Sequence, residues 1–326
     1  MPSLAILVVR LGAMGDIIHT LPAVAALKRG HPESPLVWAV EPKWEPLLEL
    51  NPFVDRVVLL HRESVAGLVA TRRSLLESSY QLAVDFQGLI KSALVAFAAN
   101  APRTFGFDAH EIRERTAAIL YGQTISSRSV HVVERNLDLA VAAGGIRPNP
   151  PVFPLPPGRP EGDLPSGDFV LASPLAGWAS KQWPLPHYRA LAARLSRELG
   201  LPLVLNGAPG AAFGPIDPAV SHGSSLPGLI HATRRAAAVV GVDSGPLHMA
   251  AALEKPGVAI FGPTDPARNG PYCHSIRVLR RAGAVTTYKR GEAIDLSMRE
   301  ISPDEVFEAL RAVLGERSPS IGCLAG

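Results

Sequence analysis

The sequence predicts an α/β protein made of two Rossmann-like, doubly wound domains that face each other across a cleft. Short apolar runs rich in β-branched residues alternate with helix-length amphipathic segments, which is the pattern of parallel β-α-β units. A proline-rich stretch interrupts the alternation once, and the same pattern then restarts. The length of 326 residues also exceeds what one hydrophobic core usually organises.

The first domain is expected to cover residues 1–150. Its opening apolar run, residues 4–9, has no basic leader and no small-residue cleavage site, so it predicts a strand and not a signal peptide. Further strands are expected at residues 36–40, 56–60, 82–86 and 104–107. Helices are expected at residues 17–29, 44–50, 65–77, 89–99, 111–120 and 131–143.

The proline-rich stretch predicts a linker. Eight prolines fall within residues 146–168, and such a segment sustains neither a helix nor a central strand. We therefore place a linker at residues 151–167 and a second domain at residues 168–326. Its strands are expected at residues 169–173, 203–206, 238–242, 258–261 and 276–279. Its helices are expected at residues 188–199, 226–235 and 247–253, with a C-terminal helix at residues 303–314.

Composition argues against several classes of function. Basic residues outnumber acidic ones only by 15 to 14 through residue 150 and by 17 to 15 after it, which argues against a nucleic-acid partner. The two cysteines, Cys273 and Cys323, are too few for a disulfide framework and indicate a reducing compartment. No apolar run reaches the roughly 18 to 20 residues that cross a bilayer, so any membrane contact is expected to be peripheral.

The loop after the first strand, residues 10–16, is the first candidate site, because ligands of open α/β sheets bind at the carboxyl ends of strands. Gly12 and Gly15 allow the backbone to approach a ligand closely. Asp16 has two interpretations. It either caps the following helix or faces the cleft as a general base that takes a proton from an acceptor hydroxyl.

The second candidate site, residues 242–248, is again a strand, a turn and a helix start, whose free N–H groups favour an anion such as a diphosphate. His248 lies one helical turn after Ser244, so it either points at the same ligand or packs as a helix histidine. Asp243 is expected to accept hydrogen bonds from sugar hydroxyls, or else to cap the helix.

Three further strand-end motifs complete the candidates. Lys181, after the first strand of the second domain, suits charge neutralisation on a leaving diphosphate but also fits a solvated surface lysine. The run Gly-Pro-Thr-Asp-Pro at residues 262–266 predicts a rigid turn that Asp265 initiates. In the first domain, Arg10, Lys91 and Arg113 are basic groups suited to an acidic acceptor.

In this order, the motifs resemble glycosyltransferase family 9, the lipopolysaccharide heptosyltransferases. The likeness covers nearly the whole chain. It is carried by residues 14–16 with 19–23, 85–92, 181–184, 242–248 and 262–266. The resemblance implies the GT-B architecture and an inverting transfer of heptose from ADP-heptose to a Kdo sugar of the lipopolysaccharide inner core. Residues 85–92 and 262–266 look more like the enzymes that add the first heptose than those that add the second.

The resemblance also implies roles for individual residues. Asp16 is the implied catalytic base, and Lys181, Asp243, Ser244, Gly245 and His248 are the implied donor-binding residues. Arg10, Gly15, Lys91 and Arg113 are expected to bind the acceptor, Kdo-lipid A. A cytoplasmic enzyme, peripheral at the inner membrane, is implied, with no cofactor and no metal. One departure is that Ala176 and Gly177 stand where the family often has small hydroxyl residues.

Two readings of other classes compete. A nicotinamide-dependent oxidoreductase is suggested by Glu41, which ends the second strand where a ribose-binding acid would lie. The first loop is Gly-x-x-Gly, however, and lacks the three-glycine fingerprint of that class. A noncatalytic carbohydrate-binding protein would keep both domains but would have no need for Asp16, Lys181 and Asp243.

Overall fold

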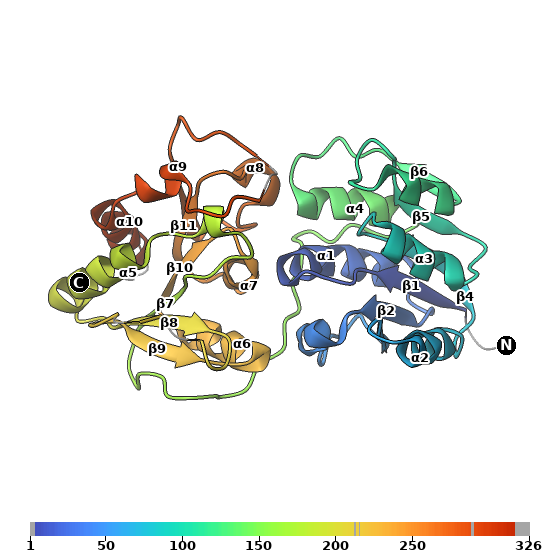
Figure 1. Cartoon of the computed structure of the whole chain (residues 1–326). Coiled ribbons are helices and arrows are strands. Elements are labelled where there is room, and N and C mark those ends of the chain that lie inside the picture. Colours follow the sequence, from blue (N-terminus) through green and yellow to red (C-terminus); the bar gives the residue numbers. More distant parts are fainter. Residues whose placement is uncertain (1–3, 212, 215, 288–289, 317–326) are drawn as a thin grey trace, which may run out of the picture. The chain divides into compact units, whose positions relative to one another are not determined.

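The chain forms two compact units, which Figure 1 shows in a computed structural model that describes residues 4–211, 213–214, 216–287 and 290–316. The first unit extends to Pro156 and the second begins at Pro157, within the proline-rich segment. No helix or strand lies between Ala142 and Val170, where the prolines are concentrated. Cys273 is a free thiol, and Cys323 lies outside the described residues.

The first unit is built on six parallel strands in the order β3-β2-β1-β4-β5-β6. They are β1 (Ala5–Val9), β2 (Leu36–Val40), β3 (Arg56–Leu59), β4 (Tyr80–Asp85), β5 (Thr104–Phe107) and β6 (Gln123–Ile125). The helices are α1 (Met14–Gly30), α2 (Val65–Leu75), α3 (Ile90–Ala98), α4 (Val132–Ala142) and the 3-10 helices η1 (Pro42–Leu47) and η2 (Arg115–Leu120).

The second unit repeats this arrangement with the order β12-β11-β10-β7-β8-β9, again all parallel. The strands are β7 (Val170–Ser173), β8 (Leu203–Gly207), β9 (Val220–Gly223), β10 (Ala238–Val242), β11 (Gly257–Phe261) and β12 (Ile276–Arg280). The helices are η3 (Ala179–Lys181), α5 (Leu185–Leu199), α6 (Leu226–Arg235), α7 (Gly245–Ala252), α8 (Pro266–Asn269), α9 (Leu296–Arg299) and α10 (Pro303–Gly315).

Continuous burial explains why the central strands read as unbroken apolar runs. Every residue of β1, β2, β10 and β11 is buried, as expected for strands of a parallel sheet covered on both faces. Within the part of the chain that the structure describes, no helix has the length and apolar character needed to cross a bilayer.

Each sheet has one topological switch point, where the strand order reverses. In the first unit it lies between β1 and β4, and in the second between β7 and β10. Ligands of open α/β sheets bind outside the carboxyl ends of the strands at such a point. The loops after these four strands are therefore the places to look for chemistry.

The structure corrects several expected elements. Residues 44–50 and 111–120 were expected to form α-helices, but they contain only η1 and η2. In η1, Pro42 and Pro46 lack the N–H that an α-helical ladder needs. The strands β6 and β9 were not predicted; both pair at a sheet edge and have exposed residues, so they lack an apolar run. The short helices η3, α8 and α9 were also missed.

Candidate active site

The loop after β1 leads directly into α1, and Asp16 lies in the first turn of that helix. The N-cap residue is Ala13, and Asp16 occupies the third helical position. Its Oδ2 accepts a hydrogen bond from the Ala13 N–H at 3.3 Å. The expectation that Asp16 is the cap residue is therefore wrong in position, although its carboxylate does bond to a backbone N–H. The side chain keeps 46% of its surface exposed, so a ligand can reach it.

Arg10, the first residue of this loop, holds the Asp16 carboxylate. The Arg10 Nη2 lies 2.8 Å from Asp16 Oδ1, and its Nη1 donates a hydrogen bond to the Phe86 carbonyl at 2.5 Å. The Arg10 side chain is only 9% exposed. A planar guanidinium bonded on two sides fixes its partner's orientation as well as its charge. Arg10 is thus directed at Asp16 within its own unit.

The turn after β4 supports the same loop across the switch point. Asp85, at the end of β4, is fully buried and accepts hydrogen bonds from the Tyr121 hydroxyl at 2.6 Å, the Ser92 hydroxyl at 2.7 Å and the Gln87 N–H at 2.8 Å. Burial raises the pKa of Asp85, while these three hydrogen bonds act in the opposite direction. The Gln87 side chain in turn accepts a hydrogen bond from the Leu11 N–H at 2.7 Å.

The two glycines of the first loop lie in tight surroundings. A Cβ on Gly12 would lie 2.7 Å from the Trp44 Nε1, so the backbone here approaches η1 more closely than other residues allow. Gly15 is buried in the first turn of α1. The backbone at Gly12, which was expected to approach a ligand closely, thus closely approaches the Trp44 side chain.

Three cations surround Glu41, which follows β2. Its Oε1 lies 3.1 Å from Lys91 Nζ and 3.4 Å from Arg62 Nε, and its Oε2 lies 3.7 Å from Lys43 Nζ. We call Lys43, Arg62 and Lys91 the basic cluster; it carries two more charges than Glu41 neutralises. The sequence predicted only Lys91 of this group. The Glu41 carboxylate is bound by these cations, so it is not suited to bind the hydroxyls of a ribose. Arg113, the other expected acceptor residue, is exposed just before η2.

In the second unit, Lys181 and Asp243 form an ion pair across the switch point between β7 and β10. The Lys181 Nζ donates to Asp243 Oδ2 at 2.8 Å, and the two side chains are 16% and 7% exposed. On the other side, His248 Nε2 lies 3.5 Å from Asp243 Oδ1. Lys181 is therefore not a solvated surface lysine. The structure brings Lys181, Asp243 and His248 together, although they come from two distant segments.

The charge state of Asp243 follows from this arrangement. Burial alone would raise its pKa, but the contacts with His248 and Lys181 outweigh burial and hold the pKa of Asp243 well below its usual range. Asp243 is thus an ionised carboxylate at neutral pH. A buried pair of this kind requires both partners, because removing one leaves an uncompensated charge.

The turn between β10 and α7 presents the start of a helix at this pair. The N-cap residue is Ser244, Gly245 is the first residue of α7, and Pro246 follows in the first turn. The alternative that Asp243 caps the helix is therefore wrong. His248 is buried on α7, within contact distance of Asp243. Free N–H groups at such a helix start attract an anion.

Three buried hydroxyls lie at the same sheet edge, and of these the sequence predicted only Ser244 as a binding residue. Ser180 Oγ, Ser244 Oγ and Thr264 Oγ1 have no hydrogen-bond partner among the described residues. Such groups are rare in folded proteins, because an unsatisfied buried hydroxyl is costly. They follow β7, β10 and β11, which places them in the strand-end loops. Hydroxyls in this position suit a ligand rich in acceptor oxygens.

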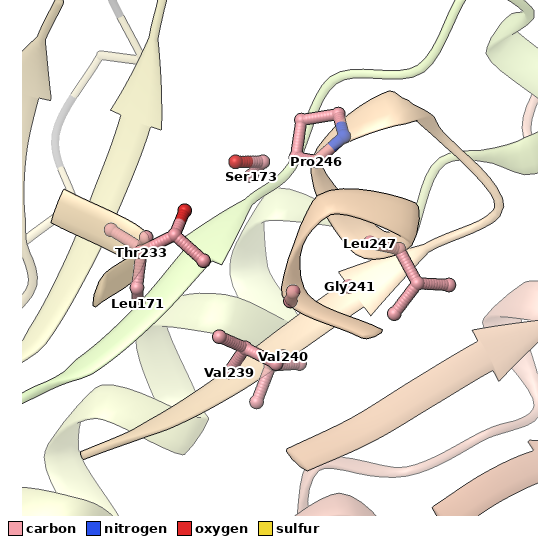
Figure 2. A pocket seen from close by; sticks show the side chains of 9 residues that line it. Leu171, Ser173, Thr233, Val239, Val240, Gly241, Pro246 and Leu247 are labelled. Atoms are coloured by element: carbon pink, nitrogen blue, oxygen red, sulfur yellow. The ribbon is translucent and has the colours of Figure 1, made fainter. Parts of the chain in front are cut away.

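A cavity lies beside α7, and Figure 2 shows its lining by Ser173, Thr233, Val240, Pro246 and Leu247. Its volume is ≈ 10 Å³. This is room for about one water molecule. The cavity is therefore a packing defect between the sheet and its helices, and it cannot hold a nucleotide sugar.

The turn at residues 262–266, after β11, forms as predicted. Asp265 Oδ1 accepts a hydrogen bond from the Ala267 N–H at 2.9 Å, so it starts the turn and caps α8. Among the described residues, no three His, Cys, Asp or Glu side chains gather in a way that suits a metal ion.

Comparison with known proteins matches this geometry to one family. The sequence profile of glycosyltransferase family 9 (heptosyltransferase) matches residues 68–294. Lipopolysaccharide heptosyltransferase 1 of Pseudomonas aeruginosa is 31% identical over 83% of this chain and 82% of its own length. Lipopolysaccharide heptosyltransferase 2 of Salmonella typhimurium is 29% identical over 95% of this chain and 99% of its own length.

A solved structure shares the fold over almost the whole chain. The structure described as Escherichia coli ADP-heptose lps heptosyltransferase II superimposes with a TM-score of 0.79 and 26% identity, covering 96% of this chain and 99% of the other. The two parallel six-stranded units are thus domains of the GT-B type. The expected fold class is confirmed, and the oxidoreductase and noncatalytic readings are wrong. The chain belongs to glycosyltransferase family 9 and is a glycosyltransferase.

Proposed function

We propose that this enzyme transfers L-glycero-D-manno-heptose from ADP-heptose to a Kdo sugar of the lipopolysaccharide inner core, with inversion at the anomeric carbon. The observation that carries the proposal is the Lys181–Asp243–His248 assembly at the switch point of the second unit, beside the start of α7. A buried cation and a helix N-terminus at one strand end suit a diphosphate. The choice of heptose as the sugar rests on the relatives, which are named heptosyltransferases.

The donor is assigned to the second unit. Lys181 and the first turn of α7, with Ser244 and Gly245, bind the diphosphate. Asp243 orients Lys181 and His248 through its two oxygens, and its remaining lone pairs are suited to sugar hydroxyls. His248 lies against the same ligand. This charge stabilisation is greatest when the bond to the leaving diphosphate breaks.

The acceptor is assigned to the first unit. Asp16 is exposed, and Arg10 fixes its orientation, which suits a general base. The basic cluster has a net positive charge next to β2, β3 and β4, where it suits the carboxylates and phosphates of Kdo-lipid A. Lys91 acts in this cluster, and Arg113 and the backbone at Gly15 complete the surface. Arg10, expected to bind the acceptor, is better suited to positioning Asp16.

The proposed reaction is a single displacement. A hydroxyl of the acceptor attacks the anomeric carbon of heptose while its proton passes to the Asp16 carboxylate. The bond from that carbon to the diphosphate oxygen breaks, and its electron pair leaves with ADP. One bond forms as one breaks on the opposite side, so the anomeric configuration inverts. Lys181 and the N–H groups of α7 stabilise the charge on the departing ADP.

The choice of acceptor is tested by direct transfer. The enzyme is incubated with ADP-heptose and either Kdo-lipid A or the same acceptor already carrying one heptose, and the products are weighed by mass spectrometry. We expect a gain of one heptose on Kdo-lipid A. A gain only on the heptosylated acceptor would assign the chain to the second transfer step, and transfer to neither would refute the proposed substrates.

Peripheral attachment to the inner face of the inner membrane is part of the proposal, because a lipid-linked acceptor lies there. The basic cluster offers a surface for anionic lipid headgroups. Sedimentation with vesicles that contain anionic lipid, compared with neutral vesicles, tests this attachment.

A further inference from the structure

The donor site is short of positive charge, because the Asp243 carboxylate neutralises Lys181. A nucleotide-sugar diphosphate brings two negative charges. Lys181 is paired with Asp243 at 2.8 Å, so the two cancel before any ligand binds. The start of α7 contributes only about half an elementary charge. If the second unit binds a diphosphate, another cation is needed close to Lys181.

Trp178 identifies that cation. Lys181 Nζ lies 4.8 Å from the centroid of the Trp178 ring, and the guanidinium carbon of Arg290 lies 6.0 Å from the same centroid. Both distances fall within the range of cation–π contacts. Both cations therefore contact the same indole ring, which places the Arg290 guanidinium in the neighbourhood of Lys181. Arg290 is exposed, so its donors are accessible to a ligand.

The segment that carries Arg290 is held against the strand-end loops of the site. Before it, the Thr287 N–H donates to the Pro263 carbonyl at 2.9 Å. After it, a Cβ on Gly291 would lie 2.9 Å from the Ser180 Cβ, so the backbone packs directly on the residue next to Lys181. The Asp295 N–H also donates to the Ser180 carbonyl at 3.3 Å. These contacts place Thr287 at the turn after β11, and Gly291 and Asp295 against Ser180 of η3.

The unpartnered hydroxyls support a ligand at this place. Ser180 Oγ is buried beside Gly291, and Thr264 Oγ1 is buried next to Pro263, the residue that anchors Thr287. Both groups are more than nine-tenths buried and have no partner among the described residues. Groups that donate hydrogen bonds thus lie on the two loops that hold the Arg290 segment, which suits phosphate oxygens.

We propose that Arg290 is a second cation of the donor site and binds the diphosphate of the nucleotide sugar together with Lys181. This inference rests on the proposed function, because it requires the donor in the second unit. Trp178 holds the guanidinium by a cation–π contact, which reduces the conformational freedom that Arg290 loses when it binds. The planar guanidinium can donate two parallel hydrogen bonds to one phosphate in a fixed geometry, whereas the ammonium of a lysine has no such fixed pair of donors.

The test compares ADP with adenosine by calorimetric titration of the full chain. We expect Arg290→Ala to weaken ADP binding about tenfold, the value of one charge-assisted hydrogen bond. Adenosine has no phosphate, so its affinity should be unchanged. Arg290→Lys should recover part of the loss. Arg277→Ala removes the same charge from an exposed position on β12 and should leave ADP binding as in the wild type.

The outcomes separate this inference from the proposed function. If the wild type binds ADP and Arg290→Ala binds it equally well, the inference is refuted and the proposed function stands. An equal loss for ADP and adenosine would also refute it, because the contact would not be to phosphate. Unchanged ADP affinity with a raised KM for Kdo-lipid A would assign Arg290 to the acceptor. A wild type that does not bind ADP would refute the proposed function itself.

Discussion

At the scale of residues, the two candidate carboxylates owe their properties to opposite environments. Asp16 is half exposed and held by one buried arginine, whereas Asp243 is buried between a lysine and a histidine. An exposed, oriented carboxylate can exchange protons with a substrate. A buried carboxylate with its pKa held low stays ionised at neutral pH, so it can accept hydrogen bonds but does not take up a proton. The environments therefore suit the roles of base and positioning group.

The first prediction concerns Asp16. Asp16→Ala should reduce heptose transfer by at least about a hundredfold, which is the lower end of what general base catalysis contributes. ADP affinity should remain as in the wild type, because the donor is assigned to the second unit. Asp16→Asn keeps an oxygen that can accept from the Ala13 N–H, so it separates the loss of the base from the loss of the helix contact. Full turnover of either variant would remove Asp16 as base.

The second prediction concerns Asp85. Asp85→Ala removes the buried carboxylate that accepts hydrogen bonds from the Tyr121 hydroxyl, the Ser92 hydroxyl and the Gln87 N–H. The Ser92 hydroxyl can still donate to the Leu89 carbonyl at 2.8 Å, so the main loss is at Tyr121 and Gln87. We expect the free energy of unfolding to fall by about 3 kcal/mol, measured by urea denaturation. Asp108→Ala removes a carboxylate of the same unit that is only partly buried and should cost less than about 1 kcal/mol. Equal effects of the two variants would contradict the role given to Asp85.

The sequence predicted which residues lie in the strand-end loops better than it predicted which of them contact one another. The strand-end rule placed Lys181 and Asp243 correctly at loop ends, since it depends only on local patterns. Their pairing was not predictable, because it joins residues 62 positions apart. The same holds for Arg10 with Phe86 and for Arg290 with Trp178. Trp178 lies three residues before Lys181 in the sequence, and an aromatic residue so close to a lysine was the available signal.

At the scale of elements, hydrophobic patterns predicted the buried strands and long helices and failed at edges and short turns. The strand β2 and the helix α6 were predicted with the bounds that the structure has. The edge strands β6 and β9 form because a neighbour offers a hydrogen-bonding edge, which no local pattern reveals. In η1, the prolines converted an expected α-helix into a 3-10 helix.

The third prediction concerns the start of α10. Ser302 caps this helix, and Glu305 both bonds back to the Ser302 N–H and pairs with Arg281. The bond from Arg281 and then the backbone of Ser302 lower the pKa of Glu305 to about 2 from its ordinary 4.5. Because the folded pKa lies below the unfolded one, the stability that Glu305 contributes is present above pH 4.5 and is lost as the pH falls toward 2.

This contribution is measured with Glu305→Gln. At pH 7 the variant should be less stable by about 1 kcal/mol, a modest value because solvent screens a half-exposed pair. The difference should shrink between pH 4.5 and pH 3 in urea denaturation. Glu292→Gln, at an exposed position of the same unit, should show little difference at any pH. A difference that grows on acidification would contradict the assignment.

At the scale of the whole molecule, the chain uses one topology twice, and a group of candidate site residues lies at each switch point. Each unit has its own sheet, and three hydrophobic core clusters of the described residues each consist of residues from one unit only. Two separate cores allow two unfolding transitions. The proposed division of labour then becomes measurable, because a ligand raises the stability of the unit that binds it.

The last prediction uses this separation in the full chain. ADP at about a hundred times its Kd should stabilise the second unit by about 2.7 kcal/mol and leave the first unit unchanged. In hydrogen exchange, amides of β10 and α7 should therefore exchange more slowly with ADP, whereas those of β1 and β4 should not. Asp85→Ala should speed exchange in β1 and β4 and leave β10 and α7 unchanged, because it weakens only the first unit. If ADP protects β1 and β4 as strongly as β10 and α7, the two units unfold together or the donor binds elsewhere. Repeating the measurement with Lys181→Ala, which should abolish the protection by ADP, distinguishes these two explanations.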